Sequence, residues 1–428
     1  MEIGVRVRYD MQCQKRGVSI MEKKAVLRMV RRIVCAVLAA LLLAVCVLAL
    51  LVALNRNDSL SGVRGVNLGS WLVLEKWMTP EVFEGVDAYD EYTLARALSP
   101  EEYEQRMREH RSTFITEEDF AAIADMGLNT VRIPIPYYIF GDRTDEPYLS
   151  CIDELDDAFD WAEEYGLQIL IDLHMVPGSQ NGFDNGGISG VCTWAQKPEE
   201  VEYALDVLER LAQRYGQRPG LFGIQPLNEP IVGDGAWEDM DVMYRYHPVD
   251  DELLAASAPI SMEFLKDFYL RAYERLRPLL PEDKWIVYHD AFGMWNWFTF
   301  MWGDDYEGVA FDTHVYLFNV ESVGLQSPFW HNAFVLGNGL LMRILQTRFP
   351  VICGEWSLAN NYALTIEDED ERSAYYTSMA EKQLETWDKY GAGGVYWSYR
   401  VGEGAQSDWD KPWDLRQCVE NGWINFSK

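Results

Sequence analysis

Residues 221–230, LFGIQPLNEP, place a short apolar run directly before the carboxylate of Glu229. A run of this length, bounded by Gly and Pro, is typical of a strand that is buried on both faces. Two interpretations of Glu229 remain open at this point. It either neighbours a helix N-cap or forms one half of a catalytic carboxylate pair.

Seven further runs of this kind occur along the chain, separated by longer amphipathic stretches. The eight runs are GVRGVNLG (62–69), NTVRIPI (129–135), LQILIDLH (167–174), LFGIQPLNE (221–229), KWIVYHDA (284–291), GVAFDTHVY (308–316), FPVICGEWS (349–357) and AGGVYWSYR (392–400). Strands that alternate with helices predict a parallel sheet, and eight of them predict an α/β fold of the (β/α)₈ or TIM barrel type. We therefore expect one barrel domain over residues 62–428.

Polar and aromatic residues stand at the ends of these runs, where a TIM barrel has its active site. They are Arg132, His174, Asn228, Glu229, His314, Tyr316, Glu355 and Trp397. Two carboxylates on different strands can flank a glycosidic bond, one as acid and the other as nucleophile. Glu229 and Glu355 are the candidates, and an ion pair between Glu355 and Arg132 is the alternative without chemistry. In the catalytic interpretation, burial and the neighbouring Glu355 would raise the pKa of Glu229.

Other strand-end residues indicate a sugar ligand rather than a metal ion. Trp397 could stack on the apolar face of a pyranose ring. His174 and His314 lack the i, i+4 spacing of a zinc-binding helix, so we expect neither a metal nor a cofactor. Because alternate strand residues share a face, Cys353 is expected one layer below Glu355, as a core thiol.

The N-terminal segment predicts a membrane anchor. Residues 33–54 form a run of 22 residues without a charge, which is long enough to cross a bilayer. Nine Lys or Arg and three acidic residues precede it, which places the N-terminus in the cytoplasm. We expect a basic tail (1–32), a transmembrane helix (33–54), a linker (55–61) and a barrel domain outside the cytoplasm at the cell membrane. A cleaved signal peptide is the alternative, although no small-x-small site follows the run.

Charge and cysteine content limit the partners. The formal net charge of −31 repels phosphate backbones, so nucleic acid is not an expected partner. Four cysteines lie after the anchor: Cys151, Cys192, Cys353 and Cys418. Their spacing is not that of a zinc site, and one disulfide between two of them remains possible. The oligomeric state is not determined by the sequence, and we expect a monomer.

Seven motifs in order carry a resemblance to a known family. The strings GVNLGSWLVLEKWMTP, VRIPI, DLHMVPGSQNGFDNGG, LNEP, HVY, GEWS and VYWSYR resemble glycoside hydrolase family 5, and in particular its exo-β-1,3-glucanase branch. The resemblance spans about residues 62 to 400. The chain departs from the family pattern at Ser70, Lys76 and Thr313, and the segment after Glu229 is longer than in the fungal enzymes.

The resemblance implies a role for each matched residue. It implies Glu229 as general acid/base and Glu355 as nucleophile of a retaining mechanism, with Arg132 and Tyr316 holding Glu355. By the same match Asn228 binds the sugar 2-hydroxyl, while His174 and His314 complete the floor of the site. Glu75 and Asp184 match positions that bind hydroxyls of the terminal sugar, and Phe183 matches an aromatic residue at the entrance.

The implied function is hydrolysis of β-glucosidic bonds in a β-glucan or β-glucoside, of the exo-β-1,3-glucanase or β-glucosidase type. An endo-β-1,4-glucanase and a β-glucosidase that acts on glycolipids remain as alternatives. An inactive carbohydrate-binding relative is the alternative from another class of protein.

Overall fold

The computed structural model describes residues 55–233, 251–302 and 306–426, together with isolated positions between residues 29 and 54. The chain divides into two compact units, Met1–Arg56 and Asn57–Lys428, and the second holds the fold described below. Most of the predicted span 33–54 lies outside the described residues. Among the residues that are described, no helix is both long and apolar enough to cross a bilayer.

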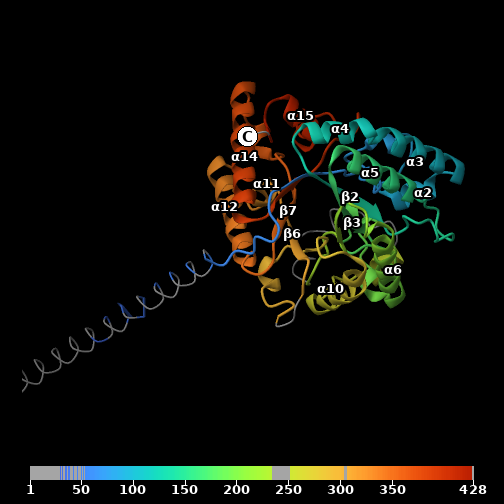
Figure 1. Ribbon diagram of the computed structural model, residues 1–428. Coiled ribbons are helices and arrows are strands. Elements are labelled where there is room, and N and C mark those ends of the chain that lie inside the picture. The colour runs from blue at the N-terminus through green and yellow to red at the C-terminus, as the bar shows by residue number, and fades with distance from the viewer. Residues whose placement is uncertain are drawn as a thin grey trace, which may run out of the picture. The chain divides into compact units, whose positions relative to one another are not determined.

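Eight parallel strands close into a barrel, in which each strand pairs with its neighbours in sequence and β8 pairs with β1 (Figure 1). The strands are β1 (Val63–Asn67), β2 (Thr130–Pro136), β3 (Gln168–Met175), β4 (Leu221–Gln225), β5 (Trp285–His289), β6 (Val309–Val315), β7 (Val351–Trp356) and β8 (Gly393–Tyr396). Six of the strands lie within the predicted runs, and β2 and β3 each extend one residue beyond theirs, so the predicted TIM barrel is confirmed.

Helices follow the strands and cover the outside of the barrel (Figure 1). The α-helices of the described part are α2 (Glu91–Ala97), α3 (Pro100–Phe114), α4 (Glu117–Asp125), α5 (Ile152–Tyr165), α6 (Pro198–Tyr215), α9 (Asp251–Ala256), α10 (Met262–Leu276), α11 (Leu317–Ser322), α12 (Pro328–Leu345), α13 (Asn361–Leu364), α14 (Glu369–Tyr390) and α15 (Leu415–Glu420). Short 3₁₀ turns include η2 (Asp184–Gly186) after β3 and η5 (Met294–Trp297) after β5. Most of the long segment after Glu229 lies outside the described residues.

The two faces of the strands pack in different layers. In β3, Ile169, Ile171 and Leu173 belong to the large apolar cluster that includes the helices. Leu170, between them, belongs to a small cluster inside the barrel with Val287 and other strand residues. Because side chains alternate along a strand, Asp172 and His174 share the inward face with Leu170. The sequences of the strands are therefore mostly apolar, although some of their side chains are polar and point into the barrel.

A register shift in β7 changes the predicted positions of Cys353 and Glu355. Thr313 of β6 pairs with Cys353 but His314 pairs with Glu355, so Gly354 is an extra residue in the ladder. Cys353 is a buried free thiol, as predicted, yet it packs in the outer apolar layer. The prediction that Cys353 and Glu355 share a face is therefore wrong, because an inserted residue reverses the alternation and redirects the next side chain.

Candidate active site

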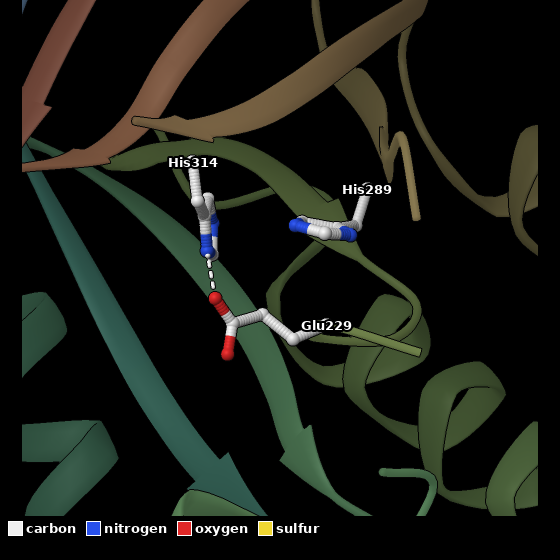
Figure 2. A group of neighbouring side chains, drawn as sticks. All are labelled: Glu229, His289 and His314. Atoms are coloured by element: carbon white, nitrogen blue, oxygen red, sulfur yellow. Dashed lines mark hydrogen bonds and ion pairs between the residues drawn. The ribbon is translucent and has the colours of Figure 1, made fainter. Parts of the chain in front are cut away.

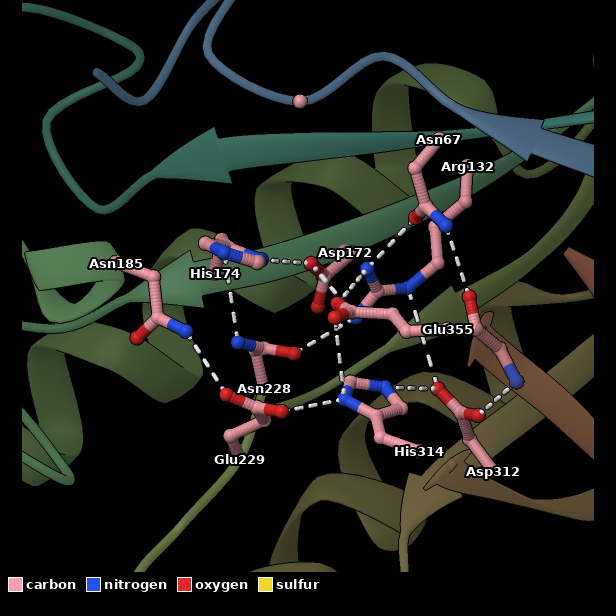
Figure 3. A network of polar contacts seen from close by, with 12 residues as sticks. Asn67, Arg132, Asp172, His174, Asn185, Asn228, Glu229, Asp312, His314 and Glu355 are labelled. Atoms are coloured by element: carbon pink, nitrogen blue, oxygen red, sulfur yellow. Dashed lines mark hydrogen bonds and ion pairs between the residues drawn. The ribbon is translucent and has the colours of Figure 1, made fainter. Parts of the chain in front are cut away.

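Arg132, in β2, is the centre of a buried polar network inside the barrel (Figure 3). Its guanidinium donates hydrogen bonds of 2.8 to 2.9 Å to Asn67, Gln225, Asn228 and Glu355, and its Nη2 lies 3.0 Å from Asp172 Oδ2. A buried guanidinium is stable only when its donors are paired, and here each nitrogen has a partner. Arg132 therefore fixes residues of several strands relative to one another.

Glu355, in β7, is held at both carboxylate oxygens. Oε1 accepts from Arg132 at 2.8 Å, and Oε2 accepts from the Tyr316 hydroxyl at 2.6 Å. Burial raises the pKa of Glu355 above its usual value, even though the charges of His314 and Arg132 act in the opposite direction. These contacts fix the orientation of a carboxylate that is only 3% exposed.

His314, in β6, lies between the two candidate carboxylates (Figure 3). Its Nδ1 is 2.6 Å from Glu229 Oε1 and 3.3 Å from Glu355 Oε2, and its Nε2 is 3.2 Å from Asp312 Oδ2. Because both oxygens contact the same nitrogen, they can be no farther apart than about 6 Å. This bound matches the carboxyl separation of retaining glycosidases, about 5 to 5.5 Å, and lies below the roughly 6.5 to 9.5 Å of inverting ones.

The proton shared by this group resides mainly on His314. Burial opposes a charge on the imidazole, yet Glu355, Asp312 and Glu229 together raise the pKa of His314 well above its usual value. Burial would also raise the pKa of Glu229, but the charge and hydrogen bond of His314, with a hydrogen bond from Asn185, lower it below the usual value. The predicted rise in the pKa of Glu229 is therefore wrong, because a cationic histidine is its nearest partner.

Glu229 lies in the turn that follows β4 rather than in the strand itself. β4 ends at Gln225, and Glu229 has a left-handed φ of 41°, which is rare outside glycine. Its Oε2 accepts a hydrogen bond of 2.8 Å from the side-chain amide of Asn185, in η2. Such backbone conformations are costly and occur mainly where the surrounding structure imposes them, often at functional sites.

His174, Asn228 and Trp397 form one wall of the site. His174 Nδ1 lies 2.5 Å from Asp172 Oδ2, and its Nε2 is 3.4 Å from the Asn228 amide nitrogen. The Asn228 oxygen accepts from Arg132, so its amide group is oriented by contacts on both sides. Trp397, directly after β8, stacks on His174 with the ring centroids 5.6 Å apart, and is only 3% exposed.

Glu75, Phe183 and Asp184 come from loops that follow β1 and β3. Burial, reinforced by the negative charge of Asp184, raises the pKa of Glu75 well above its usual value. Glu75 Oε2 accepts from the Trp77 indole at 2.8 Å, while its buried Oε1 has no hydrogen-bond partner among the described residues. Phe183 and Asp184 directly precede Asn185, whose amide donates to Glu229. All the residues predicted from the sequence therefore lie in this network or in the loops next to it.

Sequence reasoning missed part of the network. The missed residues are Asn67, Asp172, Asn185, Gln225 and Asp312, which bond Arg132, His174, Glu229, His314 or one another. Asp172 and Asp312 stand two residues before a predicted histidine, and alternation places them on the same face. A polar residue in an otherwise apolar strand was the signal that could have found them.

Glu229, His289 and His314 form a cluster with metal-ligand atoms within 4.8 Å of one another (Figure 2). His314 has a raised pKa, and in its protonated form it donates to Glu229 and offers no lone pair. His289 accepts the Ala291 N–H at Nδ1, so its neutral ring carries the proton on Nε2. In this protonation state the imidazole of His314 is a hydrogen-bond donor to Glu229.

Comparison with known proteins agrees with this architecture. Residues 98–261 match the family model described as Cellulase (glycosyl hydrolase family 5). In solved structures, the rutinosidase from Aspergillus niger has a TM-score of 0.66 at 20% identity, covering 86% of this chain and 99% of that one. PbGH5A, a glycoside hydrolase family 5 enzyme from Prevotella bryantii, has a TM-score of 0.54 at 15% identity, covering 86% and 97%. Both likenesses show the fold alone.

Two relatives in sequence are fungal proteins. The probable glucan 1,3-beta-glucosidase A of Emericella nidulans is 43% identical over 286 residues, which are 66% of this chain and 62% of that protein, so the chain spans less than two thirds of its length. The glucan 1,3-beta-glucosidase of Kluyveromyces lactis is 32% identical over 413 residues, covering 84% of this chain and 87% of that protein. With this coverage and the family match over residues 98–261, the chain belongs to glycoside hydrolase family 5.

Proposed function

We propose that the protein is a retaining glycoside hydrolase that removes glucose from β-glucans or β-glucosides. The observation that carries this proposal is the pair Glu229 and Glu355, whose oxygens are bridged by one imidazole nitrogen and lie within about 6 Å of each other. The names of the relatives, glucan 1,3-beta-glucosidases, support a β-1,3-linked glucan as substrate.

In the proposed first step, Glu355 attacks the anomeric carbon while Glu229 protonates the departing oxygen. Arg132 and Tyr316 hold the Glu355 oxygens in place, which reduces the entropy cost of reaching the reactive geometry. Glu229 then removes a proton from water, which attacks the glycosyl ester and releases the sugar with its configuration retained.

His314 supplies the proton that Glu229 needs. The imidazolium Nδ1 donates to Glu229 Oε1 across 2.6 Å, so transfer along this bond neutralises both groups without any movement of heavy atoms. A bound sugar excludes water and lowers the local dielectric constant, which favours the neutral pair. His314 is thus a proton reservoir for the acid/base in this proposal.

Exo action is favoured by two acids, the buried Glu75 on the β1 loop and the partly buried Asp184 on the β3 loop. Within the part of the chain that the structure describes, Glu75 Oε1 is buried without a hydrogen-bond partner, and a sugar hydroxyl would satisfy it. Asp184 lies close enough to influence its pKa. Two carboxyls of this kind can hold the hydroxyls of a terminal glucose, which supports exo action.

A product profile tests the proposal. Laminari-oligomers, cello-oligomers and a lichenan digest are incubated with the protein and with Glu355→Ala as the inactive control. We expect release of single glucose units from the β-1,3 series, initially as the β-anomer in proton NMR. Internal cleavage of the cello-oligomers would support an endo-β-1,4-glucanase instead. Binding without release from any substrate would support an inactive carbohydrate-binding relative.

We further propose that residues 33–54 anchor the protein in the cell membrane, with the barrel outside the cytoplasm. The charge-free run and the basic residues before it support this location. An anchored chain floats with lipid vesicles after an alkaline carbonate wash, and external protease digests its barrel in intact cells. Release by carbonate would contradict the anchor.

A further inference from the structure

Helix α12 has an exposed face without a polar side chain. The exposed positions of this helix are Phe329, Trp330, Ala333, Leu336, Gly337, Leu340, Leu341 and Ile344. Phe329 is 71% exposed and Leu340 49%. A helix on the surface of a water-soluble domain normally turns charged and polar residues outward. A contiguous apolar face of this kind marks a surface that another apolar body covers.

The inner face of α12 already has its partners. Val335, Gly339 and Met342 are buried, and α12 packs on α14 (Figure 1) and also on η5. A Cβ at Gly339 would lie 2.4 Å from a methyl group of Thr386 in α14, so this contact is close. The outer face therefore does not take part in the packing of the barrel.

Aromatic side chains next to α12 extend the apolar surface. Trp295 and Trp302 are 70% and 67% exposed, and Phe298 between them is 37% exposed. The guanidinium of Arg348, just beyond α12, lies 4.7 Å from the Trp302 ring centroid and donates to the Phe300 carbonyl at 2.9 Å. Trp residues beside a cationic side chain are typical of the boundary between lipid and water. We call the exposed residues of α12 with Trp295, Phe298 and Trp302 the α12 surface.

The start of the barrel unit is tied to the end of α12. The Asn57 N–H donates to the Gln346 carbonyl at 2.8 Å, and the Gln346 amide donates to the Asn57 carbonyl at 2.9 Å. The Asn57 side chain donates to the Arg348 carbonyl at 2.8 Å. In the sequence the charge-free run ends at Leu54, three residues before Asn57. Three residues span at most about 11 Å, so a bilayer that holds this run begins near the end of α12.

The charge of the protein also indicates which kind of partner the α12 surface would bind. The protein carries a formal net charge of −31, but between residues 328 and 345 only Arg343 is charged. An acidic domain gains nothing from anionic head groups, so its attraction to a bilayer must come from apolar burial. We infer that the α12 surface lies in the lipid interface and holds the barrel against the membrane. This inference rests on the proposed anchor and adds an orientation, with the α12 surface turned toward the lipid.

Lipid photolabelling tests this orientation. The full chain is placed in phosphatidylcholine nanodiscs that contain a phosphatidylcholine with a diazirine in its acyl chain, and the labelled peptides are identified by mass spectrometry. We expect label on residues 33–54, on 295–302 and on 328–345, with no loss between 0.1 and 1 M NaCl. Leu340→Glu should reduce the label on 328–345 by about fivefold or more, because a carboxylate resists transfer into the interface. Leu336→Glu is a second variant of the same face.

Tyr89→Glu is the matched control, since Tyr89 is 50% exposed like Leu340 but precedes α2, on another part of the barrel. It should leave the labelling unchanged, and the melting temperatures of all three variants should match the wild type. Label on 33–54 without label on 328–345 would overturn the inference and leave the anchor intact. Absence of label on 33–54 would refute the anchor itself. Cross-links between two copies through α12, with no lipid label there, would overturn the inference in favour of a dimer.

Discussion

At the scale of single residues, His314 decides where the working proton resides. It contacts Glu229, Glu355 and Asp312, and these contacts raise its pKa while lowering that of Glu229. The two residues therefore hold one proton as a pair, and the alkaline limb of the pH profile belongs to the pair. A proton that can reside on either His314 or Glu229 is bound at least as tightly as a proton that can reside on only one of them.

His314→Gln tests this sharing. The variant leaves Glu229 as the only site for the proton, so the alkaline limb of kcat/KM should move to lower pH, with a fall in the maximal rate. Glutamine keeps a hydrogen-bond donor, so the geometry of the carboxylates should persist. The measurement is kcat/KM for an aryl β-glucoside between pH 3 and 10. A limb at the wild-type position would show that His314 holds no working proton.

The roles of the two glutamates can be separated by the products that azide forms. In Glu229→Ala, a substrate with a good leaving group should still glycosylate Glu355, and azide should attack that intermediate to give the β-azide. In Glu355→Ala no intermediate forms, so azide should attack the substrate directly and give the α-azide. The anomeric coupling in proton NMR distinguishes the two. An α-azide from the Glu229 variant would mean that the roles are reversed.

The residues of the site could be predicted because polar and aromatic residues at strand ends are visible in the sequence. Their protonation states could not be predicted in this way. Glu229 and His314 are 85 positions apart, and nothing in either local sequence indicates that they form a bond of 2.6 Å. The requirement for glycine at position 354 is likewise not visible in the local sequence. A Cβ there would lie 2.1 Å from Asp312 Oδ1, while its N–H donates to that oxygen at 2.6 Å. The need for glycine arises from a neighbouring strand.

At the scale of elements, the eight strands were predictable, but their lengths and bulges were not. Apolar runs locate β4 and β8, yet β4 ends three residues before Asn228 and β8 ends directly before Trp397. The bulge at Gly354 reverses the alternation on which the placement of Cys353 depended. Such irregularities follow from barrel closure and from side-chain contacts between strands. The sequence of a single strand carries no information about either.

Directly after β5, beside β6, lies a buried carboxyl whose ionisation affects stability. Asp290 follows β5 and accepts from the Thr313 hydroxyl at 3.0 Å and the Phe292 N–H at 2.9 Å. Burial raises the pKa of Asp290 to about 7. The folded state therefore holds this proton more tightly than the unfolded state. Its contribution to stability is complete below the unfolded pKa and is lost as pH rises through 7.

The substitution Asp290→Asn should remove this loss of stability with rising pH. The free energy of unfolding of the wild type should fall between pH 5 and 8, by at most about 1.4 kcal/mol per pH unit from this group, relative to the variant. An asparagine can keep both contacts, because the Thr313 hydroxyl can accept as well as donate. Urea unfolding at several pH values measures the difference, with exposed Asp145→Asn as the control. Parallel curves for Asp290→Asn and wild type would contradict a raised pKa.

At the scale of the whole molecule, the described residues place the boundary of the barrel unit before Asn57. The sequence predicts a short linker at 55–61, between the charge-free run and the barrel domain. The structure instead gives Asn57 three hydrogen bonds to residues 346 and 348, about 290 positions away in the chain. Leu60 is also buried, in the cluster inside the barrel. This part of the linker therefore belongs to the folded unit, and the reason is a contact that is remote in sequence.

Two shortened chains test this boundary. A chain of residues 55–428 keeps the Asn57 hydrogen bonds, whereas a chain of residues 59–428 loses them. The longer chain should be more stable by about 1.5 to 4.5 kcal/mol, since it keeps three hydrogen bonds and each contributes a net of roughly 0.5 to 1.5 kcal/mol. Both should match the full chain in kcat/KM on a soluble aryl β-glucoside, because Glu229 and Glu355 lie inside the barrel, on elements that both chains keep. Urea unfolding and initial rates provide the two measurements. Equal stability of the two chains would show that Asn57 adds nothing to the fold, and a lower kcat/KM in both would show that the N-terminal segment contributes to the site.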